Sequence, residues 1–418
     1  MKVLIFQSGE PLHIDPNNRP MRGINLANKF VEKGHKVLVI SSRFDHYRKK
    51  KRVCKSLIRV NQNLEILLLN SPGYKKNISI ARLWDHAFLA LNLLHKLLSK
   101  KIPKQDLFIL GFPPIETSFV LILWSKLKKI PAIIDIKDLW PEIFISRLPQ
   151  KISMIVKILI YPYKLMSIYA IKNADITSSI SPSFLNWSQK YSKRISKQND
   201  FVAPLVSPII NLSSEEINSS LNWWKTKGIN FNNKTTFCFI GTLSIAYDFK
   251  EISKAVKLLE KKNKFFQIII CGEGTVAKEI KFLFKNCQNV YFPGWVDSNN
   301  AFVLRKYSRA SIAPYINTED FMKSIPNKII DSLSYKLPII STLKGEVKNL
   351  LKKDECGIYI ENNYLSWERA FENIIFSDKI HKKLKDNCEK IFLEKFEFNK
   401  NYNRFLINSE KLVYFKSL

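Results

Sequence analysis

Short apolar runs and longer amphipathic segments alternate along the chain. A continuous apolar run is typical of a strand buried on both faces, whereas apolar residues that recur every three or four positions indicate a helix. We expect strands at residues 2–6, 36–41, 64–69, 106–110, 132–136, 175–179, 236–240, 265–271, 290–292, 310–314, 339–341 and 357–360. The expected helices are 21–33, 80–98, 116–128, 152–174, 183–191, 249–261, 276–284, 300–307, 326–337, 365–376, 379–396 and 402–415. This alternation predicts an α/β protein with doubly wound parallel sheets.

The alternation stops and restarts near the middle of the chain, which indicates two domains. A chain of 418 residues is too long for one compact core, and domains of about 200 residues are the natural expectation. Residues 206–232 mix proline, asparagine and serine and form the expected linker, in which Trp223-Trp224 would pack between the domains. The predicted domains are 1–205 and 233–395, and a terminal helix in 396–418 would pack back on the first domain.

One of the expected helices, 152–174, is unusually rich in apolar and aromatic residues. Lysines such as Lys157 and Lys164 interrupt it, and Pro162 should kink it or split it in two. Such a helix can lie in a membrane interface with its lysines at lipid phosphates. It can equally be a core helix that packs on the sheet, and the sequence leaves both interpretations open.

The charge of the chain points to anionic partners. Lysine and arginine number 67 against 36 acidic residues, which gives a net charge of +31 and favours nucleic acid, phosphorylated small molecules or an anionic membrane surface. A lysine- and asparagine-rich composition that only coats the surface explains most of the lysines equally well. The basic residues are dispersed and match no nucleic-acid-binding motif, so we expect no nucleic acid partner. The apolar run at 1–6 is too short for a signal peptide, and no uncharged apolar stretch is long enough to span a membrane. We expect a cytoplasmic protein, with docking on the inner face of the membrane as an alternative.

The stretch 324–342 carries the strongest chemical signal. Pro326 is placed to open a helix, since its missing N–H would be unpaired in the first turn. Lys323 and Ser324 precede it, so that a loop delivers a cation and free backbone N–H groups to a helix N-terminus, which favours phosphate binding. Asp331 projects back toward the same end and could bind a sugar hydroxyl.

Glycines and polar residues gather at the ends of the expected strands, where parallel sheets bind ligands. Tight turns explain any one of these glycines, but the set suggests close approach of a ligand to the backbone. The glycines are Gly111, Gly241, Gly272, Gly274 and Gly294. Another strand end carries the polar sequence Lys137-Asp138-Leu139-Trp140-Pro141-Glu142. No cysteine or histidine spacing indicates a metal site.

Taken in order, these motifs resemble those of the retaining glycosyltransferases of family 4, and in particular the bacterial branch that builds O-antigen and capsule. The resemblance covers nearly the whole chain and implies two facing Rossmann-like domains, the GT-B arrangement. It is carried by Arg22 with Gly34-His35, Asp138-Leu139-Trp140-Pro141-Glu142, Ser181-Pro182, Phe239-Ile240-Gly241-Thr242, Gly272-Glu273-Gly274, Phe292-Pro293-Gly294-Trp295-Val296, and Pro326-Asn327-Lys328 followed by Asp331.

The resemblance implies a role for each motif. Gly294, Trp295 and Val296 would hold the nucleobase of a UDP- or GDP-linked sugar, and Asp331 the ribose. The diphosphate side would be formed by Gly241, Thr242, Gly272, Glu273, Lys323, Ser324, Ile325, Asn327 and Lys328. Lys137, Asp138 and Glu142 would face the reacting sugar, although Asp138 could instead cap the helix after it. The implied reaction is sugar transfer with retention to a saccharide or lipid-linked saccharide, with no cofactor.

The sequence also departs from the family pattern. The family usually has two acidic residues where this chain has Lys323 and Asp331, and basic residues that often follow the Gly241 loop are missing. We expect Lys323 or Lys328 to supply that charge. No D-x-D motif occurs, so metal-independent transfer is expected. Three alternatives stay open, namely a nucleotide-sugar 2-epimerase of the same fold, a non-catalytic basic binding protein and an inactive transferase.

Overall fold

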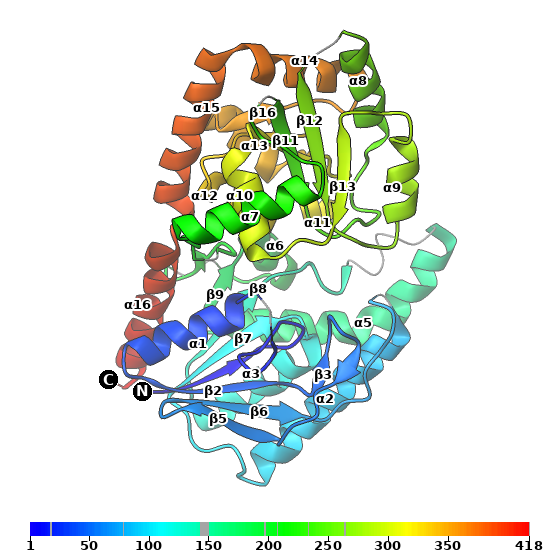
Figure 1. The fold of residues 1–418 in the computed structure, drawn as a ribbon. Helices are drawn as coiled ribbons and strands as arrows, with labels where there is room; N and C mark the ends of the chain where they lie inside the picture. Colours follow the sequence, from blue (N-terminus) through cyan, green and yellow to red (C-terminus); the bar gives the residue numbers. More distant parts are fainter. Residues whose placement is uncertain are drawn as a thin grey trace. The chain divides into compact units, whose positions relative to one another are not determined.

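The protein consists of two compact α/β units. The computed structural model describes residues 1–16, 19–77, 79–142, 150–195, 198–206, 208–232, 234–262 and 265–417 (Figure 1). The first unit comprises Met1–Ser207 and Asn399–Leu418, and the second unit Pro208–Phe398. Each unit has a parallel sheet with helices on its faces, which confirms the predicted fold class of two Rossmann-like halves.

The sheet of the first unit has the strand order β10-β9-β8-β7-β1-β2-β6-β5. All neighbours are parallel except β5, which runs antiparallel to β6. Its strands are β1 (Lys2–Phe6), β2 (Lys36–Ser42), β5 (Leu57–Asn61), β6 (Leu64–Leu69), β7 (Leu107–Phe112), β8 (Ala132–Ile136), β9 (Ile176–Ser179) and β10 (Phe201–Val202). The segment between β2 and β5 contains a small antiparallel pair, β3 (Phe44–Asp45) and β4 (Lys50–Lys51).

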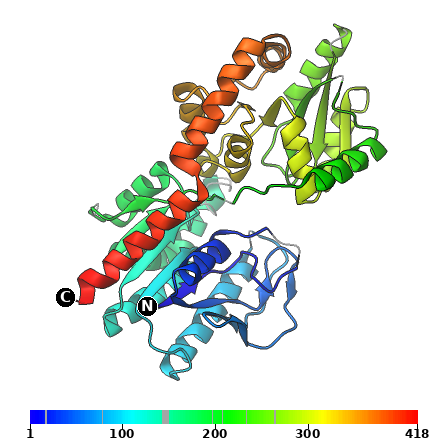
Figure 2. The same cartoon turned by 60° about the vertical axis from the view of Figure 1, so that its left-hand side comes forward.

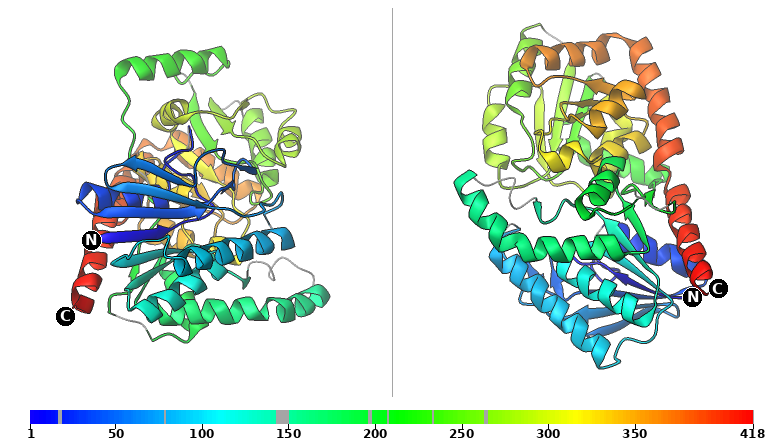
Figure 3. Two further views of the ribbon diagram at one scale, coloured as in Figure 1. Left: turned by 90° about the horizontal axis from the view of Figure 1, so that it is seen from below. Right: turned by 180° about the vertical axis from the view of Figure 1, so that it is seen from behind.

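Helices cover both faces of this sheet. Helix α1 (Arg22–Glu32) lies on one face, and α2 (Ile80–Leu98), α3 (Ile115–Lys128) and α5 (Gln150–Asn173) lie on the other (Figure 3). Helix α6 (Pro182–Ser192) packs beside α5 and begins after the N-cap Ser181, whose hydroxyl accepts from the N–H of Phe184. Because both faces are covered, strand β1 is buried almost throughout, as its continuous apolar sequence predicts.

Helix α5 has a buried and an exposed apolar side. Ile160, Ala170 and Ile171 belong to the core of the first unit, whereas Ile158 and Leu159 are 72% and 68% exposed. Pro162 lies inside the helix and does not split it. Within the described ranges, no helix is both long and apolar enough to cross a membrane.

The second unit repeats the α/β pattern with the parallel strand order β13-β12-β11-β14-β15-β16. Its strands are β11 (Thr235–Ile240), β12 (Phe266–Cys271), β13 (Val290–Gly294), β14 (Ala310–Ala313), β15 (Ile339–Ser341) and β16 (Gly357–Tyr359). Its helices are α7 (Ser214–Thr226), α8 (Lys250–Lys261), α9 (Ala277–Leu283), α10 (Ser298–Tyr307), α11 (Glu319–Met322), α12 (Asn327–Ser334), α13 (Glu346–Lys353), α14 (Tyr364–Phe376) and α15 (Asp378–Ile391), followed by the π-helical turn η1 (Phe392–Phe396).

The predicted linker is wrong over much of its length. Residues 214–226 form helix α7, which packs on α10 within the second unit. A capping box begins α7, since the Ser213 hydroxyl accepts from the N–H of Glu216 and the Glu216 side chain accepts from the N–H of Ser213. Trp224 is fully buried in the core of this unit, and its Nε1–H donates to the carbonyl of Asn300 at 3.2 Å. It therefore does not pack between the domains.

The terminal helix α16 (Phe398–Ser417) belongs almost entirely to the first unit (Figure 2). Nε2 of His35 contacts the Glu410 carboxylate at 2.8 Å, which ties α16 to the end of α1. Arg22 at the start of α1 is buried, and its Nε lies 3.2 Å from the Asp135 carboxylate on β8. The ring of Tyr402 on α16 covers the Arg22 guanidinium at 5.6 Å, so the terminal helix encloses this buried ion pair.

Candidate functional site

Three loops of the second unit meet at the carboxyl ends of β11, β12 and β13. The N–H of Gly241 donates to Cys271 O at 3.0 Å, and the N–H of Gly272 donates to Gly294 O at 2.7 Å. The N–H of Leu243 donates to Glu273 O at 2.9 Å. These bonds hold the predicted donor-binding loops against one another at a single edge of the sheet.

Two of the predicted glycines are required by the packing of these loops. A Cβ on Gly272 would lie 1.9 Å from Gly241 O, and one on Gly274 would lie 2.1 Å from Leu243 O. Both residues also have positive φ, at 132° and 158°. The close approach that the sequence suggested is thus an approach of one loop to another at these positions. Gly294, at φ 86°, has only Glu273 Oε1 near its would-be Cβ, at 3.9 Å, so that its α-carbon faces open space.

Lys328, in the first turn of α12, reaches into the same edge. Its Nζ donates to Ile240 O at 3.0 Å and lies 3.8 Å from the centre of the Phe239 ring. A Cβ on Gly241 would lie only 2.4 Å from that Nζ, so the ammonium group rests directly on the Gly241 loop. The residue as a whole is partly buried, but its charged end is enclosed. Burial and, secondly, the charge of Arg305 lower the pKa of Lys328 to about 7.

The other predicted residues around α12 have distinct surroundings. Arg305 NH2 lies 3.6 Å from the Asp331 carboxylate. Lys323 forms an ion pair with Glu319 on α11, which neutralises its charge, and Ser324 Oγ donates to Phe321 O at 3.3 Å. The side-chain oxygen of Asn327 is buried and has no hydrogen-bond partner in the described part of the chain, so it could accept from a ligand. Of the two candidate lysines, Lys328 is the one at the Gly241 loop.

The remaining residues predicted to bind the donor lie along this edge and are exposed or half-buried. Trp295 is 67% exposed, and Val296 beside it is half-buried. Thr242 and Glu273 are exposed on their loops, and Ile325 is half-buried just before α12. The three loops and helix α12 together place exposed backbone beside the enclosed ammonium group of Lys328. This arrangement suits the phosphates of a nucleotide.

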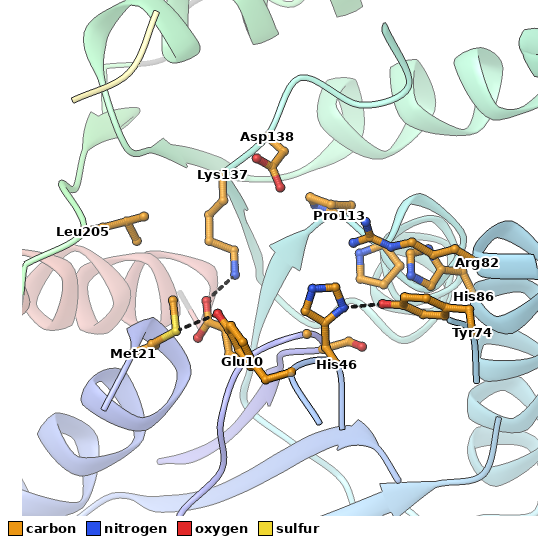
Figure 4. Close-up of a pocket in the computed structure, with 14 residues that line it drawn as sticks. Glu10, Met21, His46, Tyr74, Arg82, His86, Pro113, Lys137, Asp138 and Leu205 are labelled. Carbon is orange, nitrogen blue, oxygen red and sulfur yellow. Dashed lines mark hydrogen bonds and ion pairs between the residues drawn. The ribbon is translucent and has the colours of Figure 1, made fainter. Parts of the chain in front are cut away.

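The first unit has its own cavity, of about 240 Å³, at the carboxyl edge of its sheet (Figure 4). Predicted residues Lys137 and Asp138 line it. Lys137 Nζ donates to Glu10 Oε1 at 2.8 Å, and Glu10 Oε2 accepts from the N–H of Gly23 at 2.8 Å. Lys137 is thus held by an ion pair, which the sequence did not indicate.

Glu142 does not line this cavity. Its carboxylate lies beside Tyr191 on α6, where burial and the Glu142 charge raise the pKa of the phenol. Its predicted role at the reacting sugar therefore has no support from its position.

Sequence reasoning missed the other wall of the cavity, which contains His46, Tyr74, Arg82 and His86. Arg82 and His86 are four residues apart on α2, a spacing that places them on one face of the helix and could have drawn attention to them. His86 is only 3% exposed and stacks on Trp140 at 5.4 Å. Its Nδ1 lies 3.8 Å from the carboxylate of buried Glu116, whose pKa burial raises to about 8.

A comparison with protein families finds a match within the second unit. Residues 224–391, which lie within the second unit, match the family described as "Glycosyl transferases group 1". A comparison with curated proteins gives no match. Among solved structures, sucrose-phosphate synthase from Thermosynechococcus elongatus is similar at 11% identity and a TM-score of 0.71, over 98% of each chain.

Two further structures are similar over nearly their full length. Anabaena HepE in complex with UDP-glucose has 12% identity and a TM-score of 0.62, over 98% of this chain and 100% of that one. WaaG, a glycosyltransferase involved in lipopolysaccharide biosynthesis, has 10% identity and a TM-score of 0.61, over 97% and 98%. Identities this low show a shared fold. The chain therefore has the two Rossmann-like halves of GT-B glycosyltransferase structures, and its second unit contains the stretch that matches the glycosyl transferases group 1 family.

Proposed function

We propose that the protein is a glycosyltransferase whose second unit binds a nucleotide sugar, UDP- or GDP-linked. The observation that carries the proposal is the position of Lys328, whose enclosed ammonium group rests on the Gly241 loop in the first turn of α12. The family match spans the loops and the helix that form this edge. The Anabaena structure named above holds UDP-glucose, which supports a nucleotide sugar as the ligand class.

The proposed mechanism uses this cation against the charge that develops on the leaving diphosphate. Breaking the bond between sugar and phosphate builds negative charge on the diphosphate, and Lys328 with the N–H groups of α12 would stabilise it. Removal of one such contact typically costs about 10²–10³ in rate. The Asp331 carboxylate, one turn further along α12, would accept hydrogen bonds from the ribose hydroxyls while Arg305 orients it.

Retention and metal independence are parts of the same proposal. Same-face departure and attack would give retention without a covalent intermediate on the enzyme. Lys328 would supply positive charge in the place where other enzymes use a metal ion. Both statements are open to direct measurement, by the anomeric configuration of the product and by activity in the presence of a chelator.

The acceptor would bind in the cavity of the first unit. We propose a saccharide or lipid-linked saccharide, as in surface-polysaccharide biosynthesis, with Asp138 placed to orient its hydroxyl. A volume of about 240 Å³ is small beside the 300–1,000 Å³ of typical ligand pockets and suits about one sugar ring. WaaG acts in lipopolysaccharide biosynthesis and has the same fold, which supports this context.

An exposed apolar surface supports docking of the first unit on the cytoplasmic face of a membrane. Helix α2 has a stripe of apolar side chains that are 39–85% exposed, namely Ile80, Trp84, Phe88, Leu91 and Leu98. The exposed side of α5 adds apolar side chains between Lys157 and Lys164. Apolar residues with lysines among them are typical of surfaces that bind anionic lipid, where each basic residue adds about 1 kcal/mol.

A donor screen tests the proposed function. The protein is mixed with a panel of UDP- and GDP-linked sugars, and stabilisation of the second unit is followed by thermal shift. We expect one nucleotide sugar to raise the unfolding temperature and to be consumed when an acceptor extract is added, with a glycoside as product. Release of an epimerised sugar without a glycoside would instead identify an epimerase.

A further inference from the structure

Two cations belong to one wall of the cavity of the first unit: Arg82 lines the cavity, and Lys49 lies behind His46, which also lines it. Arg82 and Lys49 both approach the ring of Tyr74, with distances of 5.4 Å and 4.7 Å to its centre. Arg82 NH1 donates to Asn77 O at 2.9 Å and Lys49 Nζ to Asn77 Oδ1 at 2.5 Å. Neither forms an ion pair with a carboxylate in the part of the chain that the structure describes. Two like charges are thus held on one wall, and the buried Asp45 carboxylate offsets only part of their effect on the pKa of Lys49.

The charges of Arg82 and Lys49 shift the pKa values of neighbouring groups on this wall. Burial and then the charges of Lys49 and Arg82 lower the pKa of His46 to about 4. Burial and the Arg82 charge lower the pKa of Lys49 as well. Two buried carboxyls lie near these groups. Asp45 opposes the pKa shifts of His46 and Lys49, but its effect is the smallest of those that act on them. Glu116 has a pKa raised to about 8 and is mostly protonated at neutral pH, so it offers little counter-charge. An anion bound here would relieve the repulsion.

The groups on the wall are also directed at the cavity. Figure 4 shows Arg82, His86, Tyr74 and His46 on one side, opposite the neutralised pair of Lys137 and Glu10. The Tyr74 hydroxyl and His46 Nδ1 are hydrogen-bonded at 2.5 Å, and Lys49 lies behind His46 with its Nζ 3.4 Å from the same nitrogen.

Unused hydrogen-bonding capacity remains on this wall. The Nε of Arg82 and the Nδ1 of His86 are buried and have no hydrogen-bond partner within the described ranges. His86 is almost fully buried and lines the cavity, but its Nδ1 lies 3.8 Å from the Glu116 carboxyl, so that Arg82 is the better placed of the two to meet a ligand.

We infer that Arg82, with the positive charge of Lys49 behind the same wall, binds the phosphate group of a phosphate-bearing acceptor. This inference rests on the proposed function, since it names the chemistry of the acceptor in the cavity of the first unit. An arginine fork beside a lysine point charge suits the several oxygens of a phosphate. The phosphate can belong to a lipid-linked or to a water-soluble sugar. The exposed Ile80 and Trp84, which flank Arg82 on α2, favour the lipid-linked form.

The site can be tested through His46 without any transfer assay. Histidine is labelled with ¹³C, the His46 signal is assigned by comparison with His46→Gln, and its titration is followed with and without inorganic phosphate, at constant ionic strength maintained with chloride. We expect phosphate to move the His46 pKa upward from about 4, because a bound anion offsets the two neighbouring cations. Failure of the donor screen together with this shift would contradict the proposed function but not the phosphate site.

Variants decide whether the shift belongs to this wall. Arg82→Gln combined with Lys49→Gln should abolish it, whereas Lys50→Gln, which removes an exposed charge at the position directly after Lys49, should leave it unchanged. Lys328→Met, which alters only the second unit, should also leave it unchanged. An unaltered shift in the double variant, or no shift in the native protein at millimolar phosphate, would overturn the inference.

Two further probes separate the sources of the phosphate. Glucose 1-phosphate represents a soluble acceptor, and phosphatidylcholine vesicles with or without phosphatidic acid represent a lipid phosphate. A response of His46 to either probe that Arg82→Gln with Lys49→Gln removes supports the phosphate site and identifies its source. A response to neither probe, together with none to inorganic phosphate, rejects it.

Discussion

Replacement of Lys328 by methionine is expected to stabilise the free protein while it weakens donor binding. The ammonium group is enclosed by the Phe239 ring, the Tyr247 ring and Ile240 O, and no carboxylate is paired with it in the described part of the chain. Burial lowers its pKa from 10.5 to about 7. Methionine keeps an unbranched side chain of similar length and removes the charge.

The pKa shift of Lys328 gives the free-energy cost of burying its charge. A difference of about 3.5 pKa units at about 1.4 kcal/mol each gives at most about 5 kcal/mol. The direction of the pH dependence follows from the number of protons bound in the folded and unfolded states. Between pH 7 and 10.5 the unfolded chain keeps the proton that folded Lys328 has lost, so the stability of the second unit rises with pH there. The destabilisation caused by burying charged Lys328 is fully present below about pH 7 and disappears toward pH 10.5.

Urea unfolding at pH 6.5 and pH 9, followed by a probe in the second unit, measures this effect. Lys328→Met should be more stable than the native protein by up to a few kcal/mol at pH 6.5, and the difference should shrink at pH 9. Lys262→Met, at an exposed position in the same unit, is the control and should show no such pH dependence. A Lys328→Met protein that is equally stable or less stable at both pH values would refute the reasoning.

Three further predictions follow from packing and charge. Gly272→Ala should destabilise the second unit by more than about 2 kcal/mol and abolish donor binding, because its Cβ would lie 1.9 Å from a carbonyl oxygen. Thermal unfolding measures this, and the control is Gly228→Ala, which has positive φ but open space around its Cβ and should destabilise by only about 1 kcal/mol. Arg22→Ala should destabilise the first unit by about 3–5 kcal/mol, since Asp135 would be left buried without its partner; urea unfolding of that unit checks this. Lys164→Glu should weaken sedimentation with anionic vesicles several-fold at low salt, and native binding that ignores both salt and acidic lipid would contradict electrostatic docking.

The periodic segments of the fold could be predicted from sequence, and the reasons for the misses are local. Strand β6 and helix α2 match their predicted bounds because an apolar run or stripe dominates each of them. Helix α7 falls in the predicted linker because its asparagine, serine and lysine residues outnumber the apolar ones around buried Trp224. Its capping box, Ser213 with Glu216, was present in the sequence as a signal for a helix start.

The candidate site was predictable only in part, because side-chain partners depend on the fold. Lys328 could be proposed from its place at the start of a helix, and the structure locates it at the Gly241 loop. The ion pair of Lys137 with Glu10 joins residues 127 positions apart, which no local pattern reveals. Arg82 and Lys49 both approach the Tyr74 ring from separate elements, so the concentration of positive charge at this wall appears only in three dimensions.

Calorimetric titration with UDP- and GDP-linked sugars tests the central claim most directly. We predict that at least one of them binds the native protein and that Lys328→Met weakens its affinity by about 10²-fold or more, while Lys262→Met binds as the native protein does. A protein that binds none of these nucleotide sugars, or one whose affinity is the same with and without the Lys328 ammonium group, would contradict the proposed donor site.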